Sequence, residues 1–526
     1  MKSKKHKKVT PEPKKKAAKI PAAHIRVQVF VSGMAVMAVE LAASRLYAPY
    51  FGSSVFVWAG LIGALLLFLA AGYHVGGRLS RAGAGPDKFF LLALAASVFA
   101  GAAPYIARPV MAVTSDMAGI GGNMLPGVLA TSVAALAIPL VLYGSALPLA
   151  TGVLARVRDD AGSVAGLLYA LSTAGSIIGV FLPVLVTLPT VGTRLTFLIF
   201  SAAPALVAAA GLGRVKWALL LLIFVPYGVF AGAAPVKPAE RGEKQIAERE
   251  TAYNYARIVE KDGALRMTVD QGWFEYSVMI PGKVRSDTYR DYFPLARLLS
   301  GKREFPGSVC ILGAAGGTDA RVLRHVFPGV RITGVEIDPG LVSLGEKYMG
   351  LKSATDRIVV SDGRAFLRKS GERYDLIIVD VYNQAYIPFH MATVEFFRLV
   401  RSRLAPGGVV AFNVAWRTGD DMELVRRCAD TLRRVFPTVY LKQFEHRTNT
   451  LFFAAAAEVP VKKLQRNIAR NENSYIRSLV AETPVAMILY TGSGPRYFTD
   501  DLAPVEYLTD VTIGRFFSLV REKGYN

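Results

Sequence analysis

The sequence predicts two joined parts: a polytopic α-helical membrane domain, then an α/β domain with a Rossmann-like, doubly wound sheet and a small preceding β segment. The 526-residue chain is 52% hydrophobic, and its mean hydropathy is positive. Apolar stretches of about twenty residues, long enough to cross a hydrocarbon core, are confined to its first half. In the second half, short apolar runs alternate with amphipathic stretches, as strands alternate with helices.

Residues 1–26 form a basic tail with nine lysines and one arginine against a single glutamate. Such a segment cannot bury apolar surface and is predicted to be disordered. A basic tail can bind nucleic acid, but this one lacks interleaved aromatic residues and leads directly into an apolar stretch. The pattern therefore favours a cytoplasmic tail that orients the first span, and no nucleic-acid partner.

Residues 27–234 are predicted to form about seven transmembrane helices of a multi-pass cell-membrane protein. The expected spans are residues 27–47, 54–75, 89–107, 125–147, 163–187, 193–212 and 215–233. Basic residues gather in alternate connecting segments: Arg78, Arg81 and Lys88, then Arg156 and Arg158, then Arg214 and Lys216. This alternation predicts a cytoplasmic amino terminus.

Seven spans would place the α/β domain outside the cell, whereas a nucleoside cofactor of the kind that its strand ends indicate is made inside it. Residues 101–155 contain the prolines Pro104, Pro109, Pro126, Pro139 and Pro148. An extra span or a re-entrant segment is therefore expected there. On this basis the α/β domain is predicted to be cytoplasmic.

Two pairs of residues stand out within the apolar half. Glu40 and Arg45 are ionisable groups inside the first span, where they either line a substrate or ion path or form a structural pair. Arg45 can also extend its charged end to the membrane interface. Gly175 and Gly179, four residues apart, predict close packing between two helices.

The second half divides into three segments. Residues 235–250 are polar, lack strand periodicity and are predicted to be a linker. Residues 251–300 contain the short runs of a small β segment, and residues 301–526 form the Rossmann-like domain. Its strands are predicted from SVCIL, VRITGVE, RIVVS, DLIIVD and GVVAFNV.

Glycine and acidic residues follow four successive predicted strands, whose carboxyl ends form the ligand edge of such a sheet. A glycine turn from Gly313 through Gly316 lets backbone amides approach a ligand. Glu336, about twenty residues further on, can accept both hydroxyls of an adenosine ribose. Asp362, followed by Gly363, can accept from an adenine amino group, and Asp380 ends the fourth strand. This order suits an S-adenosyl sulfonium and is typical of the methyltransferase-type fold.

Further motifs resemble the spermidine synthase (polyamine aminopropyltransferase) family. VEID, SDG, IIVD and APGGVVAFNV match its α/β domain. The segments ETAYNYARIVE, YRDYF, DVYNQAYIPFH and TDDLAPVEYL are most similar to its membrane-fused branch. The four-strand pattern alone would equally suit a methyltransferase, and these added motifs favour the polyamine family.

The resemblance implies an aminopropyl transfer from decarboxylated S-adenosylmethionine, as co-substrate, to an amine such as putrescine, releasing methylthioadenosine. It implies that Asp380 is the base and that no metal is required. The implied co-substrate contacts are Asn254, Gly313, Gly316, Glu336, Asp362 and Gly363. The implied amine-site residues are Tyr289, Asp319 and Asn383. Two departures from the family, Asn383 in place of an aspartate and the basic Arg290, leave the identity of the amine open.

Two other functions remain open from the sequence. One is a methyltransferase that uses ordinary S-adenosylmethionine, and the other is a transporter whose α/β domain senses a nucleotide or a polyamine. The expected partners are a small-molecule amine and the lipid bilayer, with a homo-oligomer possible because soluble family members often dimerise. Asp500, Asp501 and Glu506 either add acidity to the site or form a solvated turn.

Overall fold

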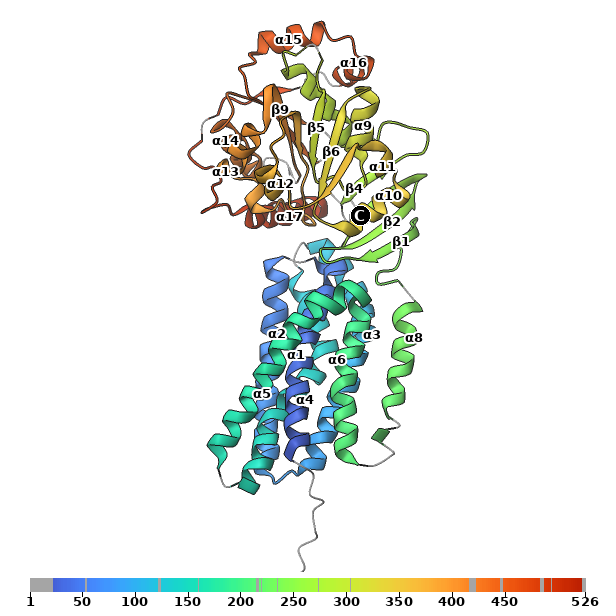
Figure 1. The fold of residues 1–526 in the computed structure, drawn as a ribbon, viewed down its shortest axis with the longest axis vertical. Coiled ribbons are helices and arrows are strands. Elements are labelled where there is room, and N and C mark those ends of the chain that lie inside the picture. The colour runs from blue at the N-terminus through green and yellow to red at the C-terminus, as the bar shows by residue number, and fades with distance from the viewer. Residues whose placement is uncertain are drawn as a thin grey trace, which may run out of the picture.

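The computed structural model describes residues 22–522 except 53, 122–123, 159, 214–216, 219, 234, 273, 303, 416–421, 445–447, 483–486 and 493. A helical bundle and an α/β domain are stacked end to end (Figure 1). The fold class predicted from the sequence is confirmed. Most of the predicted basic tail lies outside the described residues, and its last five residues, 22–26, already belong to the first helix.

The bundle is made of long apolar helices joined by short connections. It consists of α1 (Ala22–Phe51), α2 (Val55–Arg81), α3 (Pro86–Gly121), α4 (Leu125–Arg158), α5 (Ala161–Leu182), the π-helical turn η1 (Pro183–Thr187), α6 (Leu188–Leu212), the 3-10 turn η2 (Leu220–Ile223) and α8 (Phe224–Ala233). Within the described part of the chain, five helical stretches are long and apolar enough to cross a membrane, and the last of them is Ala161–Leu212. That stretch contains two helices, because the backbone is non-helical at Gly192, where φ is 80°.

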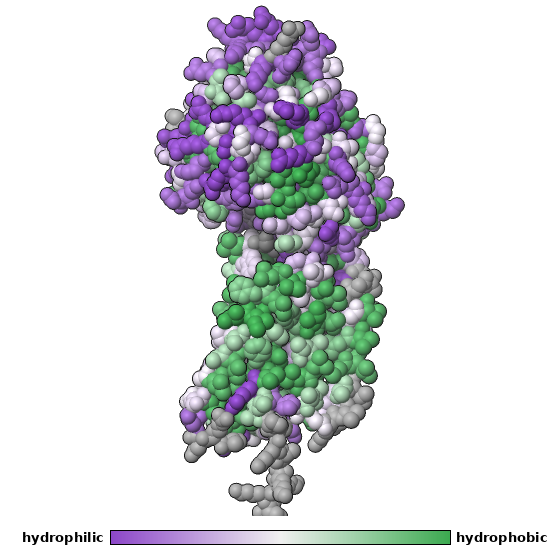
Figure 2. Space-filling model, viewed as in Figure 1, coloured by the Kyte–Doolittle hydropathy of each residue, from purple (hydrophilic) through white to green (hydrophobic). Residues whose placement is uncertain are grey.

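On the face shown in Figure 2 the surface of the bundle is largely apolar, whereas that of the α/β domain is mostly polar. Large side chains such as Leu67, Leu185 and Val229 are more than 60% exposed there. Exposed apolar surface of this extent is suited to lipid contact. Close packing at Gly175 and Gly179 is confirmed, because a Cβ at either position would overlap a backbone carbonyl of α1.

The expected extra or re-entrant segment in residues 101–155 is absent from the described residues of that range. α3 continues to Gly121 and α4 begins at Leu125, with Pro104, Pro109, Pro139 and Pro148 accommodated inside these helices. Neighbouring helices can compensate for the hydrogen bonds that an internal proline removes. The amino end of α1 and the α/β domain consequently lie at opposite ends of the bundle (Figure 1). In a bundle that spans the membrane, these two ends face opposite sides.

A four-stranded antiparallel sheet follows the bundle. Its strands, in spatial order, are β1 (Lys244–Glu250), β2 (Tyr255–Lys261), β3 (Ala264–Val269) and β4 (Glu275–Met279). β1 corrects the prediction of a linker over residues 235–250. β1 is an edge strand without a buried residue, and backbone pairing to β2 holds it in place. Its sequence therefore lacks the alternation of apolar and polar residues that predicts a strand.

The main sheet has eight strands in the order β12-β10-β11-β9-β8-β5-β6-β7. The strands are β5 (Ser308–Leu312), β6 (Arg331–Glu336), β7 (Arg357–Val360), β8 (Tyr374–Val379), β9 (Leu404–Val414), β10 (Thr438–Gln443), β11 (Thr450–Ala455) and β12 (Ile488–Leu489). β5 to β9 are parallel, and β10 to β12 add an antiparallel edge. Alternate residues of β5 enter two separate cores, so both faces of the sheet are covered.

The helices around this sheet are short. They are the 3-10 helix η3 (Tyr289–Leu299), α9 (Thr318–Val326), α10 (Pro339–Tyr348), α11 (Leu351–Ala354), α12 (Gly363–Lys369), the 3-10 turn η4 (Phe389–Met391), α13 (Val394–Ser402), α14 (Glu423–Arg433), α15 (Val461–Ala469), α16 (Ser474–Ala481) and α17 (Val505–Glu522).

Polar contacts fasten the two halves together. Arg45, at the end of the bundle near the α/β domain, donates to the backbone carbonyls of Thr251 and Tyr253. Glu250 accepts hydrogen bonds from the backbone nitrogen of Thr193, at 2.8 Å, and from its hydroxyl, at 2.5 Å. Arg45 thus has a structural role as a tie between the two halves, while Glu40 is buried within the bundle.

Candidate active site

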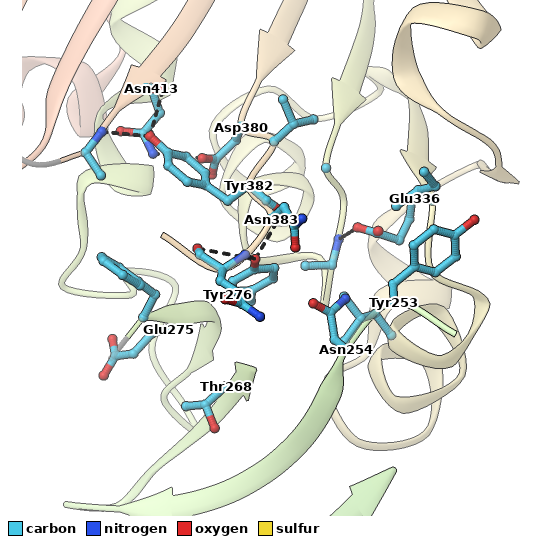
Figure 3. Close-up of a pocket in the computed structure, with 18 of the residues that line it drawn as sticks. Tyr253, Asn254, Thr268, Glu275, Tyr276, Glu336, Asp380, Tyr382, Asn383 and Asn413 are labelled. Carbon is cyan, nitrogen blue, oxygen red and sulfur yellow. Dashed lines mark hydrogen bonds between the residues drawn. The ribbon is translucent and has the colours of Figure 1, made fainter. Parts of the chain in front are cut away.

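A cavity of about 810 Å³ lies at the carboxyl ends of β5, β6, β7 and β8 and extends to the four-stranded sheet. The strand order reverses between β5 and β8, which is where ligands bind in open α/β sheets. Eight of the ten residues singled out by the sequence line it: Asn254, Tyr289, Gly313, Glu336, Asp362, Gly363, Asp380 and Asn383. Figure 3 shows Glu336 and Asp380 in one pocket, at the ends of two strands that flank β5.

Glu336 is held at the end of β6 by backbone amides. Its carboxylate accepts from the nitrogens of Ala315, at 3.0 Å, and Asp338, at 3.1 Å. Burial raises the pKa of Glu336 to about 6, although these amides act in the opposite direction. Gly313 has a φ of 89°, and a Cβ there would overlap the carbonyl oxygen of Asp380, so only glycine allows the two strand ends to approach this closely.

Gly316 requires a correction, because it does not line the cavity. Its amide donates to the hydroxyl of Ser277 at 2.8 Å, and a Cβ at Gly316 would lie 2.6 Å from the sulfur of Met349. The glycine turn therefore presents Gly313 and Ala315 to the cavity, while Gly316 packs against the four-stranded sheet and α10.

Asn254 and Asp362 lie on the cavity wall near Glu336 and the end of β7, respectively. Asn254 donates from Nδ2 to Asp338 at 3.0 Å, and its buried Oδ1 has no partner among the described residues. Asp362 caps α12 and lies 3.3 Å from Nε2 of His390. The hydrogen bond with His390 lowers the pKa of Asp362, so this carboxylate is charged at neutral pH.

Asp380 follows β8 and is only 8% exposed. The hydroxyl of Tyr289 donates to both of its oxygens, at 3.0 and 2.9 Å, and Nδ2 of Asn413 donates to one of them at 2.8 Å. Nε of Arg290 lies 3.5 Å from the other oxygen. Donors from η3 and β9 thus fix the orientation of this carboxylate while one side of it faces the cavity.

Asp319 also requires a correction, because it lies behind Arg290 and does not line the cavity. Its Oδ1 is 3.5 Å from Nε of Arg290. Burial, followed by the negative charge of Asp380, raises the pKa of Asp319 well above its ordinary value, while Arg290 and Arg321 lower it in part. Arg290 therefore carries the positive charge of a buried triad with two acids, and only Asp380 of those acids reaches the cavity.

Asn383 is exposed at the margin of the cavity, on a tight turn in which its backbone pairs with that of Tyr386. The acidic cluster near the carboxyl end lies elsewhere. Asp500 pairs with Arg364 and accepts from Thr393, and Asp501 and Glu506 are exposed, so the three form no part of the cavity wall.

Several residues that line the cavity were not predicted from the sequence. Tyr276 of β4 donates to the carbonyl of Tyr382 at 3.0 Å and accepts from the backbone nitrogen of Gln384 at 2.8 Å. Tyr382 in turn donates to the carbonyl of Asn413 at 3.1 Å. Asn413 ends the strand next to β8, so the strand-end rule that identified Asp380 would also have identified it. No comparable signal marks Tyr276, because it comes from the other sheet.

The charged groups do not form a recognisable metal site. Among the residues with assigned positions, no group of three or more His, Cys, Asp or Glu side chains could hold a metal ion.

Residues 304–454 match the spermine/spermidine synthase domain, which confirms the family resemblance for this stretch. The chain is 29% identical over 277 residues to a probable polyamine aminopropyl transferase of Bifidobacterium longum, covering 50% of this chain and 61% of that protein. It is 30% identical over 164 residues to the human eEF1A lysine and N-terminal methyltransferase, covering 28% and 23% respectively. The crystal structure of a probable spermidine synthase from Corynebacterium glutamicum aligns with 19% identity and a TM-score of 0.38, over 51% of this chain and 98% of that one.

Proposed function

We propose that this protein transfers an aminopropyl group from decarboxylated S-adenosylmethionine to an amine and releases methylthioadenosine, with Asp380 as the base. The observation that carries this proposal is that Asp380 shares one cavity with Glu336 and Asp362, which all lie at the carboxyl ends of strands in one parallel sheet. A cavity of about 810 Å³ is large enough for a nucleoside and a small amine. The similarity to proteins named polyamine aminopropyltransferases supports the same reaction.

The co-substrate half of the cavity is defined by two carboxylates. Glu336 would accept from the ribose hydroxyls, and Asp362 would accept from the adenine amino group. Gly313 allows close approach of the nucleoside to the backbone, and the unpartnered Oδ1 of Asn254 is free to accept a hydrogen bond from the ligand. Gly363 begins α12 directly after Asp362, so its backbone lines the same wall.

The reaction is a displacement at the methylene beside the sulfonium. The nitrogen lone pair of the acceptor forms the new C–N bond while the C–S bond breaks. The electron pair of the C–S bond stays on sulfur, which becomes a neutral thioether. An alkylamine is protonated at neutral pH, so the nitrogen must first lose a proton, and Asp380 would receive it. Tyr289 and Asn413 hold the carboxylate in position for this transfer.

The charge around Asp380 favours an acceptor with a single ammonium over a dication such as putrescine. Asp319 adds little negative charge, because its pKa is raised well above the ordinary value, and Arg290 lies between Asp319 and Asp380 as a compensating positive charge. Asn383 is neutral as well. A second ammonium would therefore meet a buried positive charge without a free carboxylate in the described part of the cavity near Asp380.

A methyltransferase is the second candidate, because the similarity to the human methyltransferase points to it. In addition, the turn from Gly313 to Gly317 has no acidic side chain to hold the amine of an aminopropyl group. The two activities use the same nucleoside contacts and differ in the group that leaves sulfur.

The test is to incubate the full-length protein, purified in detergent, with decarboxylated or ordinary S-adenosylmethionine and a panel of amines, and to identify the thioether. Methylthioadenosine is expected, and S-adenosylhomocysteine would instead establish the methyltransferase. Asp380→Asn should lower kcat by about 10²–10⁴-fold, the usual contribution of a general base. Asp375→Asn, at the opposite end of β8 and ion-paired with Lys302, is the matched control and should retain activity. Full activity in Asp380→Asn would exclude the proposed base.

A further inference from the structure

Positive charge is distributed unevenly between the two ends of the helical bundle. Basic residues lie at the start of α1, at the end of α2, at the start of α3 and at the end of α4. They are Arg26, Arg78, Arg81, Lys88, Arg156 and Arg158. These helix ends all belong to the end of the bundle where α1 begins, which we call the basic end. In the sequence, nine lysines precede α1, and Arg214 and Lys216 lie between α6 and α8.

The connections between helices at the other end contain no lysine or arginine, whereas the segment from α8 to β1 contains Lys237 and Arg241. The uncharged connections are the segments 52–54, 122–124 and 183–192. The arginines nearest to this end lie within helices and have partners. Arg45 donates to Thr251 and Tyr253, Arg194 donates to the carbonyl of Pro235 at 2.6 Å, and Arg108 of α3 lies close to the hydroxyl of Tyr50. Arg45 and Arg194 hold the α/β domain and its preceding segment, so they serve attachment.

The direction of the last helix decides on which side the α/β domain lies. Trp217 and Leu221 pack in one cluster with Ile25 and Phe89, which lie near the start of α1 and α3 at the basic end. α8 then runs alongside α3 in the same direction, since Phe224 contacts Gly101 and Tyr227 stacks on Tyr105.

Beyond α8 the chain emerges at the end opposite to the basic one. The carbonyl of Val236 accepts from the hydroxyl of Tyr50, near the end of α1, at 3.4 Å. Residues 217–233 would span about 26 Å as a helix, close to the thickness of a hydrocarbon core. The bundle therefore crosses the membrane an odd number of times between the start of α1 and β1, and the α/β domain lies beyond the last crossing (Figure 1).

We infer that the α/β domain and its cavity lie on the extracytoplasmic side of the membrane, opposite to the basic end. Lysines and arginines in short connections remain on the cytoplasmic side of a multi-pass protein. The reverse orientation would expose every basic connection between helices outside the cell and leave the uncharged connections between helices inside, together with the segment that contains Lys237 and Arg241.

This orientation adds a step before the reaction. An S-adenosyl sulfonium is a charged nucleoside that does not cross a hydrocarbon core unaided. A transport step, which moves a cationic nucleoside out of the cytoplasm, must therefore supply the co-substrate to the cavity. The acceptor amine, in turn, would be drawn from the extracytoplasmic pool.

The test labels single cysteines introduced into the full-length protein, in spheroplasts of an expressing bacterium, with a maleimide that cannot cross the membrane. Cys310 and Cys428 are both buried and free, so the native background should be low. Lys462→Cys, on the exposed surface of α15, should be labelled in intact spheroplasts. Ala82→Cys, at the exposed end of α2 on the basic side, should be labelled only after lysis.

Protection of Lys462→Cys, or labelling of Ala82→Cys, in intact spheroplasts would overturn the inference. Both variants are labelled in detergent as a control for reactivity. Labelling reports orientation and needs no turnover, so its outcome is independent of whether the proposed reaction is correct.

Discussion

Replacing Arg290 by glutamine should change the preference of the enzyme from monoamines towards diamines. Nε of Arg290 lies 3.5 Å from Oδ2 of Asp380 and 3.5 Å from Oδ1 of Asp319, and the side chain is 7% exposed. A diamine bound through one nitrogen to Asp380 would hold its second ammonium near this guanidinium. At roughly 6 Å and an effective dielectric constant of about 20, two such charges repel by about 3 kcal/mol.

That energy corresponds to a factor of about one hundred in relative affinity. The quantity to measure is the ratio of kcat/KM for putrescine to kcat/KM for butylamine. It should rise about a hundredfold in Arg290→Gln, because the substitution removes the repulsion between the guanidinium and the second ammonium. The effect should change little with ionic strength, because buried charges are screened weakly.

Two variants control this measurement. Arg290→Lys keeps the positive charge and should keep the wild-type ratio. Arg321→Gln removes a charge that also acts on Asp319, but its side chain donates to the carbonyls of Val278 and Met349 and does not line the cavity. If Arg290→Gln is inactive, the affinities of the two amines can be compared by calorimetry on protein bound to methylthioadenosine. A ratio that stays at the wild-type value in both assays would refute the electrostatic argument.

Three further predictions concern the co-substrate, the base and the bundle. Because burial raises the pKa of Glu336 to about 6, its carboxylate is charged above that pH and protonated below it. The KM for the co-substrate should be constant above about pH 7 and rise up to about tenfold per pH unit below 6, and Glu336→Gln should raise KM and remove this dependence. Tyr289→Phe should lower kcat by about 10–100-fold without changing the KM of the co-substrate, since a hydrogen bond to a charged group contributes about 1.5–3 kcal/mol. An unchanged kcat in steady-state assays would argue against a role of Tyr289 in orienting Asp380. In detergent, Gly179→Ala should lower the unfolding temperature, because the added Cβ would overlap the carbonyl of Met34. Gly166→Ala on the same helix is the control, because a Cβ there meets open space and should leave the unfolding temperature unchanged. Equal melting curves for the two variants would contradict the packing argument.

The fold could be predicted where one physical signal dominates. Long apolar stretches predict the helices of the bundle, and buried runs such as SVCIL and DLIIVD predict the parallel strands, because burial on both faces leaves little choice of residue. β1 was missed because an edge strand depends on backbone pairing, which any polar sequence can supply. The prolines of α3 and α4 misled for a related reason, since contacts between helices, invisible in the sequence, decide whether a proline interrupts a span.

The site could be predicted where local sequence determines position. Glu336, Asp362 and Asp380 each follow a strand, so the parallel sheet alone brings them to one edge. The position of Asp319 depends instead on η3, a segment distant in sequence that places Arg290 between Asp319 and the cavity. Contacts of this kind between separate elements carry no local pattern, and they determine which acid faces the ligand.

The cavity of the α/β domain lies close to the connection between α1 and α2 in the bundle. Gly52, in the connection after α1, is so close to the α/β domain that a Cβ there would lie 2.9 Å from Oε1 of Gln384, a residue of the cavity wall. The cavity is therefore adjacent to the end of the bundle that we assign to the extracytoplasmic side. Sealed right-side-out vesicles should consequently turn over co-substrate added outside, without permeabilisation. Inside-out vesicles should require permeabilisation, because the cavity would then face the sealed lumen. If both vesicle types turn over co-substrate only after permeabilisation, the co-substrate does not reach the cavity from the side on which the α/β domain lies. That result would indicate that the co-substrate is supplied through the bundle.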